Sequence, residues 1–180
     1  MKLNKRAVAL LVSLVMLLTA AVGATVAFII DRSQDVENTF TPSRVACRVV
    51  EKTAPAGASK AYTVKNIGDT AAYIRVAVLV NWKNGDGQLY AQAPEFTVTP
   101  GDGWHLGADG YYYFTKSVAV DAEISEVLLI SINSAAPAGY EQLSVEVVAS
   151  AIQATSEAVS DWSSGVATVG VDGTLTVTTQ

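Results

Sequence analysis

The sequence predicts an all-β domain, an antiparallel sandwich or barrel, that follows an apolar N-terminal segment. Apolar and polar residues alternate along several short runs, most clearly in AAYIRVAVLVNW from residue 71 to 82. Turns rich in Gly, Asn, Asp and Pro separate these runs. No stretch after the N-terminal segment shows the strand–helix–strand rhythm of a parallel sheet, so the strands are expected to pair antiparallel.

The N-terminal segment has the three parts of a secretory signal. Basic residues open the chain, an apolar run extends from residue 7 to 30, and small residues gather near its end. Thr25 and Ala27 form a small-x-small pattern in front of the Ala27–Phe28 bond. This bond is therefore the expected cleavage site.

An uncut membrane anchor is the alternative for the same segment. The apolar run has 24 residues, which is enough to span a bilayer. Small residues close to its end favour cleavage instead. Residues 1–27 are then a signal peptide, expected to be helical, and residues 28–180 form one exported domain large enough for a sizeable core. Such a protein contacts the membrane only through the signal segment before cleavage.

The strands are expected in a regular series after this segment. In the clearest run, Ile74, Val76, Val78 and Val80 are expected to face the core, whereas Arg75 is expected to face solvent. The predicted strands cover residues 39–51, 60–66, 72–82, 95–99, 110–116, 124–133 and 142–154.

The end of the chain predicts two smaller elements. Residues 153–162 indicate a short helix, and residues 165–180 indicate a hairpin that turns at Asp172–Gly173. This tail is rich in Thr and Val, has little charge and contains no proline. It either completes the domain's own sheet or, as an exposed edge, pairs with another chain. We treat residues 163–180 as a C-terminal hairpin extension.

Charge and cysteine content narrow the functional classes. Removal of residues 1–27 takes away three of the 12 basic residues and none of the 17 acidic ones, which leaves a net charge of about −8. An acidic surface repels nucleic acid, so we expect no nucleic-acid partner. Cys47 is the single cysteine and alternates with Val45 and Val49, which places it on an apolar strand face. An intermolecular disulfide or a reactive thiol is the alternative for Cys47.

The residues that carry enzyme chemistry are scarce. His105 is the single histidine, in a glycine-rich stretch expected to be a surface loop, and no signature of a catalytic triad or zinc site accompanies it. We therefore expect no catalysis, no metal and no cofactor. A structural calcium site is an alternative for the oxygen-bearing side chains of Asn84–Gly87, Asp102 and Asp109. The residue spacing of an EF-hand is absent, however. Asn-Gly and Asp-Gly pairs favour a simple turn at Asn84–Gly87.

An aromatic cluster follows the turn at Asp109–Gly110. Tyr111, Tyr112 and Tyr113 precede Phe114 on one predicted strand. Their rings can form a surface patch that stacks on sugars, or they can pack within and around a sandwich core. The large area that each ring buries favours packing.

Four short motifs, in order along the chain, carry a resemblance to a known family. They are Ala27–Asp31 followed by Asn38–Phe40, then Val64–Gly68 with Ala72–Val76, then Asp109–Tyr113, and finally Val147–Ala149 with Ile152–Ala154. Together they resemble the TasA and camelysin-like family of exported bacterial surface proteins, which the SipW signal peptidase processes. The tail after residue 162 lies outside this resemblance.

The resemblance implies a jelly-roll-like β-sandwich at the bacterial cell surface or in the extracellular matrix. It also implies a SipW-type signal peptidase as a processing partner, and self-association or a matrix partner protein. TasA members form biofilm fibres in which an N-terminal strand completes the neighbour's sheet. In this chain cleavage would free Phe28, Ile29, Ile30 and Asp31 as the start of a donor strand that reaches Val36.

Three functions are therefore carried forward from the sequence. The first is a secreted structural subunit that assembles by strand addition, such as a fibre-associated protein of a biofilm matrix. The second is a surface module that binds glycan or protein. The third is a camelysin-like metallopeptidase, which the sequence disfavours because no ligand set is recognisable.

Overall fold

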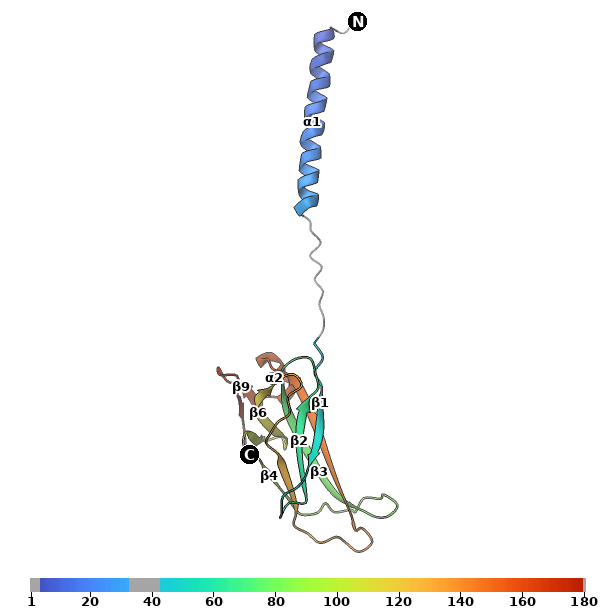
Figure 1. The fold of residues 1–180 in the computed structure, drawn as a ribbon, viewed down its shortest axis with the longest axis vertical. Helices are drawn as coiled ribbons and strands as arrows, with labels where there is room; N and C mark the ends of the chain where they lie inside the picture. The colour runs from blue at the N-terminus through green and yellow to red at the C-terminus, as the bar shows by residue number, and fades with distance from the viewer. Residues whose placement is uncertain (1–3, 33–42, 180) are drawn as a thin grey trace. The chain divides into compact units, whose positions relative to one another are not determined.

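The computed structural model describes residues 4–32 and 43–179, which belong to two compact units, residues 1–41 and 42–180 (Figure 1). In the first unit, helix α1 runs from Lys5 to Arg32. Its few hydroxyl groups bond to the helix's own backbone, as where Thr19 Oγ1 donates to the carbonyls of Val15 and Met16. Nowhere in the described ranges does a helix combine the length and the apolarity needed to cross a bilayer.

The second unit is built from antiparallel strands and one short helix. The elements are β1 (Cys47–Lys52), β2 (Lys60–Asn66), β3 (Ala72–Lys83), β4 (Phe96–Pro100), β5 (Trp104–Leu106), β6 (Tyr112–Val118), β7 (Leu128–Ile132), β8 (Gln142–Gln153), α2 (Ser156–Ser163), β9 (Ala167–Val169) and β10 (Leu175–Val177). One four-stranded sheet has the order β1-β2-β7-β4, and the other has the order β5-β6-β3-β8. Strands β9 and β10 form a separate hairpin. The prediction of an all-β, antiparallel domain is confirmed.

The core lies between the two four-stranded sheets. Strand β3 supplies Ile74 and Val76, both fully buried, and they pack with Val64 of β2 and Leu128 of β7. A second group joins Tyr62, Val80 and Ile130 toward the other end of the strands. The alternation in β3 therefore predicted its inward face, although Val78 is only half-buried.

The outer face of the second sheet is also covered at one end, which the sequence did not predict. Figure 1 shows α2 and β9 beside β6 at this end. Their side chains bury Tyr73 and Tyr113, which lie on the face opposite the core of Ile74 and Val76. This second cluster consists of Tyr73, Tyr113, Val159, Ala167 and Leu175. The tail completes its own domain here, with a hairpin that turns near Asp172–Gly173 as predicted.

Side-chain hydrogen bonds fix the turn after β2. Asn66 is fully buried, and its amide donates to the carbonyls of Thr70 and Val118 while its oxygen accepts from the Gly68 amide. A Cβ atom at Gly68 would lie 2.5 Å from the carbonyl oxygen of Arg44, so only glycine fits. The Val64–Gly68 motif is thus explained by packing and hydrogen bonding of the chain itself.

Several element boundaries differ from the sequence prediction. The strand predicted for residues 124–133 begins only at Leu128, because Ile124 turns into the core and its carbonyl accepts the buried Thr63 hydroxyl. Of the strand predicted for 39–51, residues 43–46 are not strand, and residues 39–42 lie outside the described residues. The predicted loop around His105 is instead strand β5, paired with β6, although His105 itself is exposed.

Candidate functional site

Half of strand β3 has a neighbour on one side only. Its whole length from Ala72 to Lys83 pairs with β8, but β6 pairs with it only as far as Val76. On the β6 side, the next contact is the Tyr90 amide, which donates to the carbonyl of Trp82. Within the described part of the chain, residues 77–81 therefore form an open edge in the middle of a four-stranded sheet.

The direction of the free backbone groups follows from the strand geometry. Because the Trp82 carbonyl points to the β6 side, the N–H and C=O groups of Val80 and Val78 point to that side as well. These two residues thus present alternating donors and acceptors, which is the pattern with which another strand forms hydrogen bonds. The open edge, residues 77–81, is long enough for a ladder of average strand length.

An apolar groove runs beside the open edge and has a volume of about 360 Å³. Leu79 and Leu89, exposed by 55% and 57%, stand at its border. Half-buried Phe96 of the opposite sheet also faces it. The groove residues are Val78, Leu79, Val80, Asn81, Leu89, Ala93, Phe96, Ser144 and Glu146.

The groove exists because the two sheets differ in extent. The sheet β1-β2-β7-β4 continues past the point where β6 stops, so Phe96 and Val98 of β4 face a ribbon made of β3 and β8 alone. A strand laid along the open edge would cover Phe96 and give the second sheet its missing neighbour. The geometry therefore leaves an unpaired strand edge beside an apolar groove.

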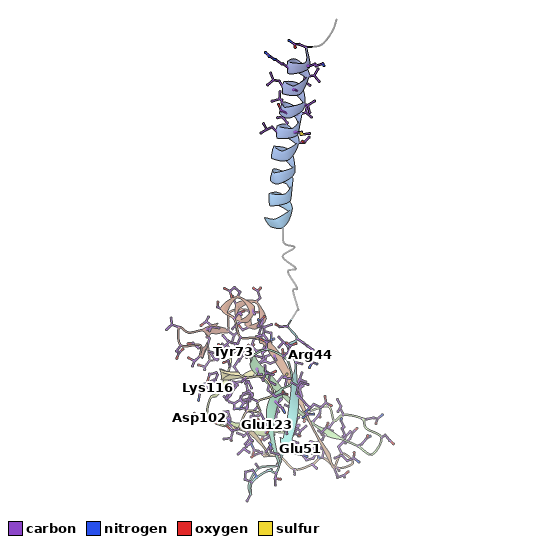
Figure 2. The ribbon with its side chains drawn as sticks, turned by 45° about the horizontal axis from the view of Figure 1, so that its top comes forward. Arg44, Glu51, Tyr73, Asp102, Lys116 and Glu123 are labelled. Atoms are coloured by element: carbon purple, nitrogen blue, oxygen red, sulfur yellow. The ribbon has the colours of Figure 1, made fainter. Side chains whose placement is uncertain are left out.

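Another edge of the domain is protected by charge. Glu51 and Glu123, labelled in Figure 2, form ion pairs with Lys60 and Lys52 around edge strand β1. Charged side chains of this kind discourage pairing with other chains. Among the described residues, one ion pair lies near the open edge of β3: it joins Lys83 at the end of the strand to Glu146 of β8, which lines the groove. The edge itself, residues 77–81, carries no charged side chain.

The predicted cleavage site and donor strand fall on helix α1. Ala27, Phe28 and residues 29–31 are helical in the intact chain, whereas residues 33–36 of the predicted donor lie outside the described residues. Cleavage and donor-strand formation stay predictions. The sequence reading missed the open edge, although a signal was present: the alternating run of β3 is much longer than the tyrosine-rich run of β6 that pairs with it.

Tyr111, Tyr112 and Tyr113 do not form the surface patch that the sequence offered as an alternative. Tyr113 is fully buried under the tail, and Tyr112 packs on the opposite face of the sheet, against the core. Tyr111 and Tyr112 are both half-buried, and Tyr111 lies at the border of the outer cluster. Successive strand residues point to opposite faces, so three in a row cannot share one surface.

Arg75 does not point to free solvent, contrary to the sequence prediction. Its guanidinium carbon lies 4.3 Å from the ring centre of Tyr111 and 4.5 Å from that of Trp162. It donates to the Tyr113 hydroxyl, and it lies 3.6 Å from an Asp109 oxygen. We call these five residues, Arg75, Asp109, Tyr111, Tyr113 and Trp162, the Arg75 cluster.

The Arg75 cluster is a structural contact between the tail and the sheet. Burial, followed by the hydrogen bond to Asp109, raises the pKa of Tyr113 to about 12. The phenol therefore stays protonated at neutral pH and donates to Asp109 at 2.6 Å. Cation–π contacts of this kind stabilise a packed arginine without any catalytic role. The Asp109–Tyr113 motif is accounted for by this packing.

The remaining candidate residues lie apart from one another. Half-buried Cys47 is a free thiol that packs against the main core, and this burial raises its pKa. Asn84–Gly87 is a turn in which the Asn84 side chain accepts from the amides of Asp86 and Gln88. Over the ranges that the structure describes, no three His, Cys, Asp or Glu residues gather as a metal site would require.

Comparisons with known protein families, curated proteins and solved structures gave no match.

Proposed function

We propose that this chain is a secreted or cell-surface structural subunit that assembles by strand addition, as a TasA-like component of a bacterial biofilm matrix or its fibres. The observation that carries the proposal is the open, apolar edge of β3 at residues 77–81. The finer fold would be a jelly-roll-like β-sandwich. A SipW-type signal peptidase would release the domain, and self-association or a matrix protein would supply the partner.

Main-chain hydrogen bonds would supply affinity at this edge. An incoming strand would pair with the free groups of Val78 and Val80, while its alternate side chains point into and out of the sandwich. The inward side chains would cover Phe96, and the outward ones would lie beside Leu79. The groove would therefore bind most tightly a segment whose first residues are apolar on both faces of the strand.

The segment from Phe28 to Val36 is the proposed donor. Phe28 and Ile30 lie two residues apart, so on a strand they would share one face and fill the groove together. In the intact chain residues 28–32 are the last turns of α1. Cleavage after Ala27 would leave only these five residues of the helix, far fewer than an isolated helix needs for stability. Processing would therefore convert a helix end into an available strand.

Two chains that differ only at the N-terminus test the assembly. A chain that begins at Phe28 should form higher-order species in analytical ultracentrifugation and fibres or oligomers in electron microscopy. A chain that begins at Asn38 should remain monomeric, because it lacks the donor. Monomers from both chains at high concentration, or identical assembly by both, would rule out the donor-strand proposal.

A further inference from the structure

The turn between β3 and Leu89 contains the one asparagine in the sequence that is followed by glycine, Asn84–Gly85. Gly85 is exposed, and a Cβ atom added to it would meet no other atom within 4 Å. An asparagine in front of glycine loses its side-chain amide most readily, because no side chain shields the backbone nitrogen that attacks it. The surroundings of the Asn84 side chain decide whether this reaction proceeds in the folded domain.

The Asn84 side chain is folded forward over the Gly85 peptide. Its oxygen Oδ1 accepts from the backbone amides of Asp86 at 3.1 Å and Gln88 at 2.8 Å, both of which lie beyond Gly85 in the chain. Its nitrogen Nδ2 donates to the Gln88 side-chain oxygen at 2.9 Å. The side-chain carbon Cγ is thereby directed toward the Gly85 nitrogen, with which it would close a small succinimide ring.

The two amide donors have the arrangement of an oxyanion hole. As the Gly85 nitrogen attacks Cγ of Asn84, negative charge develops on Oδ1, and N–H groups already aimed at that atom stabilise the charge without rearrangement. The attack is also intramolecular, so it needs no encounter between separate molecules and its entropic barrier is low. The fold therefore prepares Asn84 for the reaction.

We propose that Asn84 is a site of spontaneous deamidation in the folded domain. The Gly85 N–H loses its proton to water or hydroxide, and the nitrogen electron pair forms a bond to Cγ of Asn84. The bond from Cγ to Nδ2 then breaks, and Nδ2 takes up a proton and leaves as ammonia. Water opens the succinimide ring at either carbonyl, which yields aspartate or isoaspartate at this position. The net reaction consumes one water and releases one ammonia.

The product differs from Asn84 in charge and, as isoaspartate, in the path of the backbone. A carboxylate cannot donate to the Gln88 oxygen as the Nδ2 group does, so that hydrogen bond is lost. In isoaspartate the main chain runs through Cγ, and the carbonyl that accepts the Gly87 amide becomes part of a free carboxylate. Both changes fall in the turn that leads to Leu89 at the border of the apolar groove, so the modification would alter this border.

Two other asparagines provide internal controls. The Asn66 oxygen also accepts from an amide two residues on, that of Gly68, but Asn66 is fully buried and is followed by the branched Ile67. The Asn81 oxygen accepts from the amide of the very next residue, Trp82, at 2.8 Å, so that nitrogen faces the oxygen and not Cγ. Neither asparagine should react at a rate comparable to that of Asn84.

Peptide mapping of the full chain in detergent micelles tests the proposal. The folded protein is kept for several weeks in mildly alkaline buffer made with heavy-oxygen water and is then digested with trypsin in ordinary water. Trypsin places Asn84, Asn66 and Asn81 in three separate peptides, each with a single asparagine. The peptide that begins at Asn84 should gain about 3 Da and separate into two products, whereas the other two peptides should keep their mass.

One variant and one control decide the outcome. Gly85 has no positive φ and no close neighbour, so alanine fits there without strain. Gly85→Ala should slow product formation by about tenfold or more, because a methyl group then stands beside the attacking nitrogen. Gln92→Ala, exposed further along the same loop, should react at the wild-type rate. No label at Asn84, equal labelling of all three asparagines, or an undiminished rate in Gly85→Ala would each overturn the proposal.

Discussion

The two halves of strand β3 share one alternating sequence pattern but have opposite surroundings. The first half, up to Val76, has a strand on either side, a core beneath it and the tail above it. The second half, from Ala77, has β8 on one side and an open groove on the other, and Leu79 is 55% exposed. Local sequence makes both halves strands, whereas the length of the neighbouring strand decides which half is core and which is an edge.

A buried charge should give the largest difference in stability between variants of the two halves of β3. Val76→Asp places a carboxylate at a fully buried position, and we expect it to lower the free energy of unfolding by about 4 kcal/mol or more. Val78→Asp lies at the groove, where water reaches the carboxylate, and should cost about 2 kcal/mol. Urea unfolding followed by circular dichroism measures both values. Equal losses would show that the second half is as closed as the first.

Removal of the Arg75 side chain tests the packing on the outer face of the first half of β3. Arg75→Ala should cost about 2 to 3 kcal/mol, because it removes contacts with two aromatic rings and leaves Asp109 without its ion pair. Lys116→Ala, on exposed β6 surface, is the matched control and should change stability by less than about 0.5 kcal/mol. If the two variants unfold at the same denaturant concentration, the tail does not pack on the sheet as described.

A smaller effect is expected from the tyrosine in the same cluster. Tyr113→Phe removes one hydroxyl with two partners and should cost about 1 kcal/mol at neutral pH. The folded protein keeps the phenol proton up to about pH 12, whereas the unfolded chain loses it near the ordinary pKa of 10.0. This stabilisation is therefore complete below pH 10.0 and is lost as pH rises toward about 12.

Thermal melts of the wild type and the Phe variant across this pH range measure the difference. The wild type should lose more stability than Tyr113→Phe above pH 10.0, so that the two melting curves converge. Parallel loss in both proteins would mean that other groups, and not Tyr113, control unfolding at high pH.

The smallest effect on stability is expected at the open edge. Leu79→Lys puts a charge on an exposed position beside the groove and should change the free energy of unfolding by less than about 0.5 kcal/mol. It should nevertheless reduce assembly of the chain that begins at Phe28, because a lysine on an edge discourages strand pairing. Val148→Lys, similarly exposed on β8 but outside the groove, is the control and should assemble normally. Equal assembly by both variants would place the contact elsewhere.

The sequence predicted those features of the fold that depend on nearest neighbours along the chain. The alternation in β3 identified its inward face, and Asp172–Gly173 identified the turn of the terminal hairpin. The surroundings of the Arg75 side chain could not be predicted in this way, because the residue that covers it, Trp162, is far away in the sequence. A polar residue in an alternating strand is expected to face water unless a distant segment packs over it.

The open edge of β3 was harder to predict for the same reason. The open edge at residues 77–81 depends on where β6 stops beside β3, which is a property of the register between two strands. Strand lengths gave a partial signal for the edge, because the alternating run of β3 is longer than the run of β6 that pairs with it.

The position of the tail means that the outer face of the sheet can be covered only late in folding. Tyr73 and Tyr113 are synthesised before the residues that cover them, such as Ala167 and Leu175. Until then one aromatic face of the sheet stays wet, and the cation of Arg75 lacks the indole of Trp162. A chain truncated before the hairpin would therefore leave this aromatic face exposed, and exposed apolar surface of this kind promotes aggregation during folding.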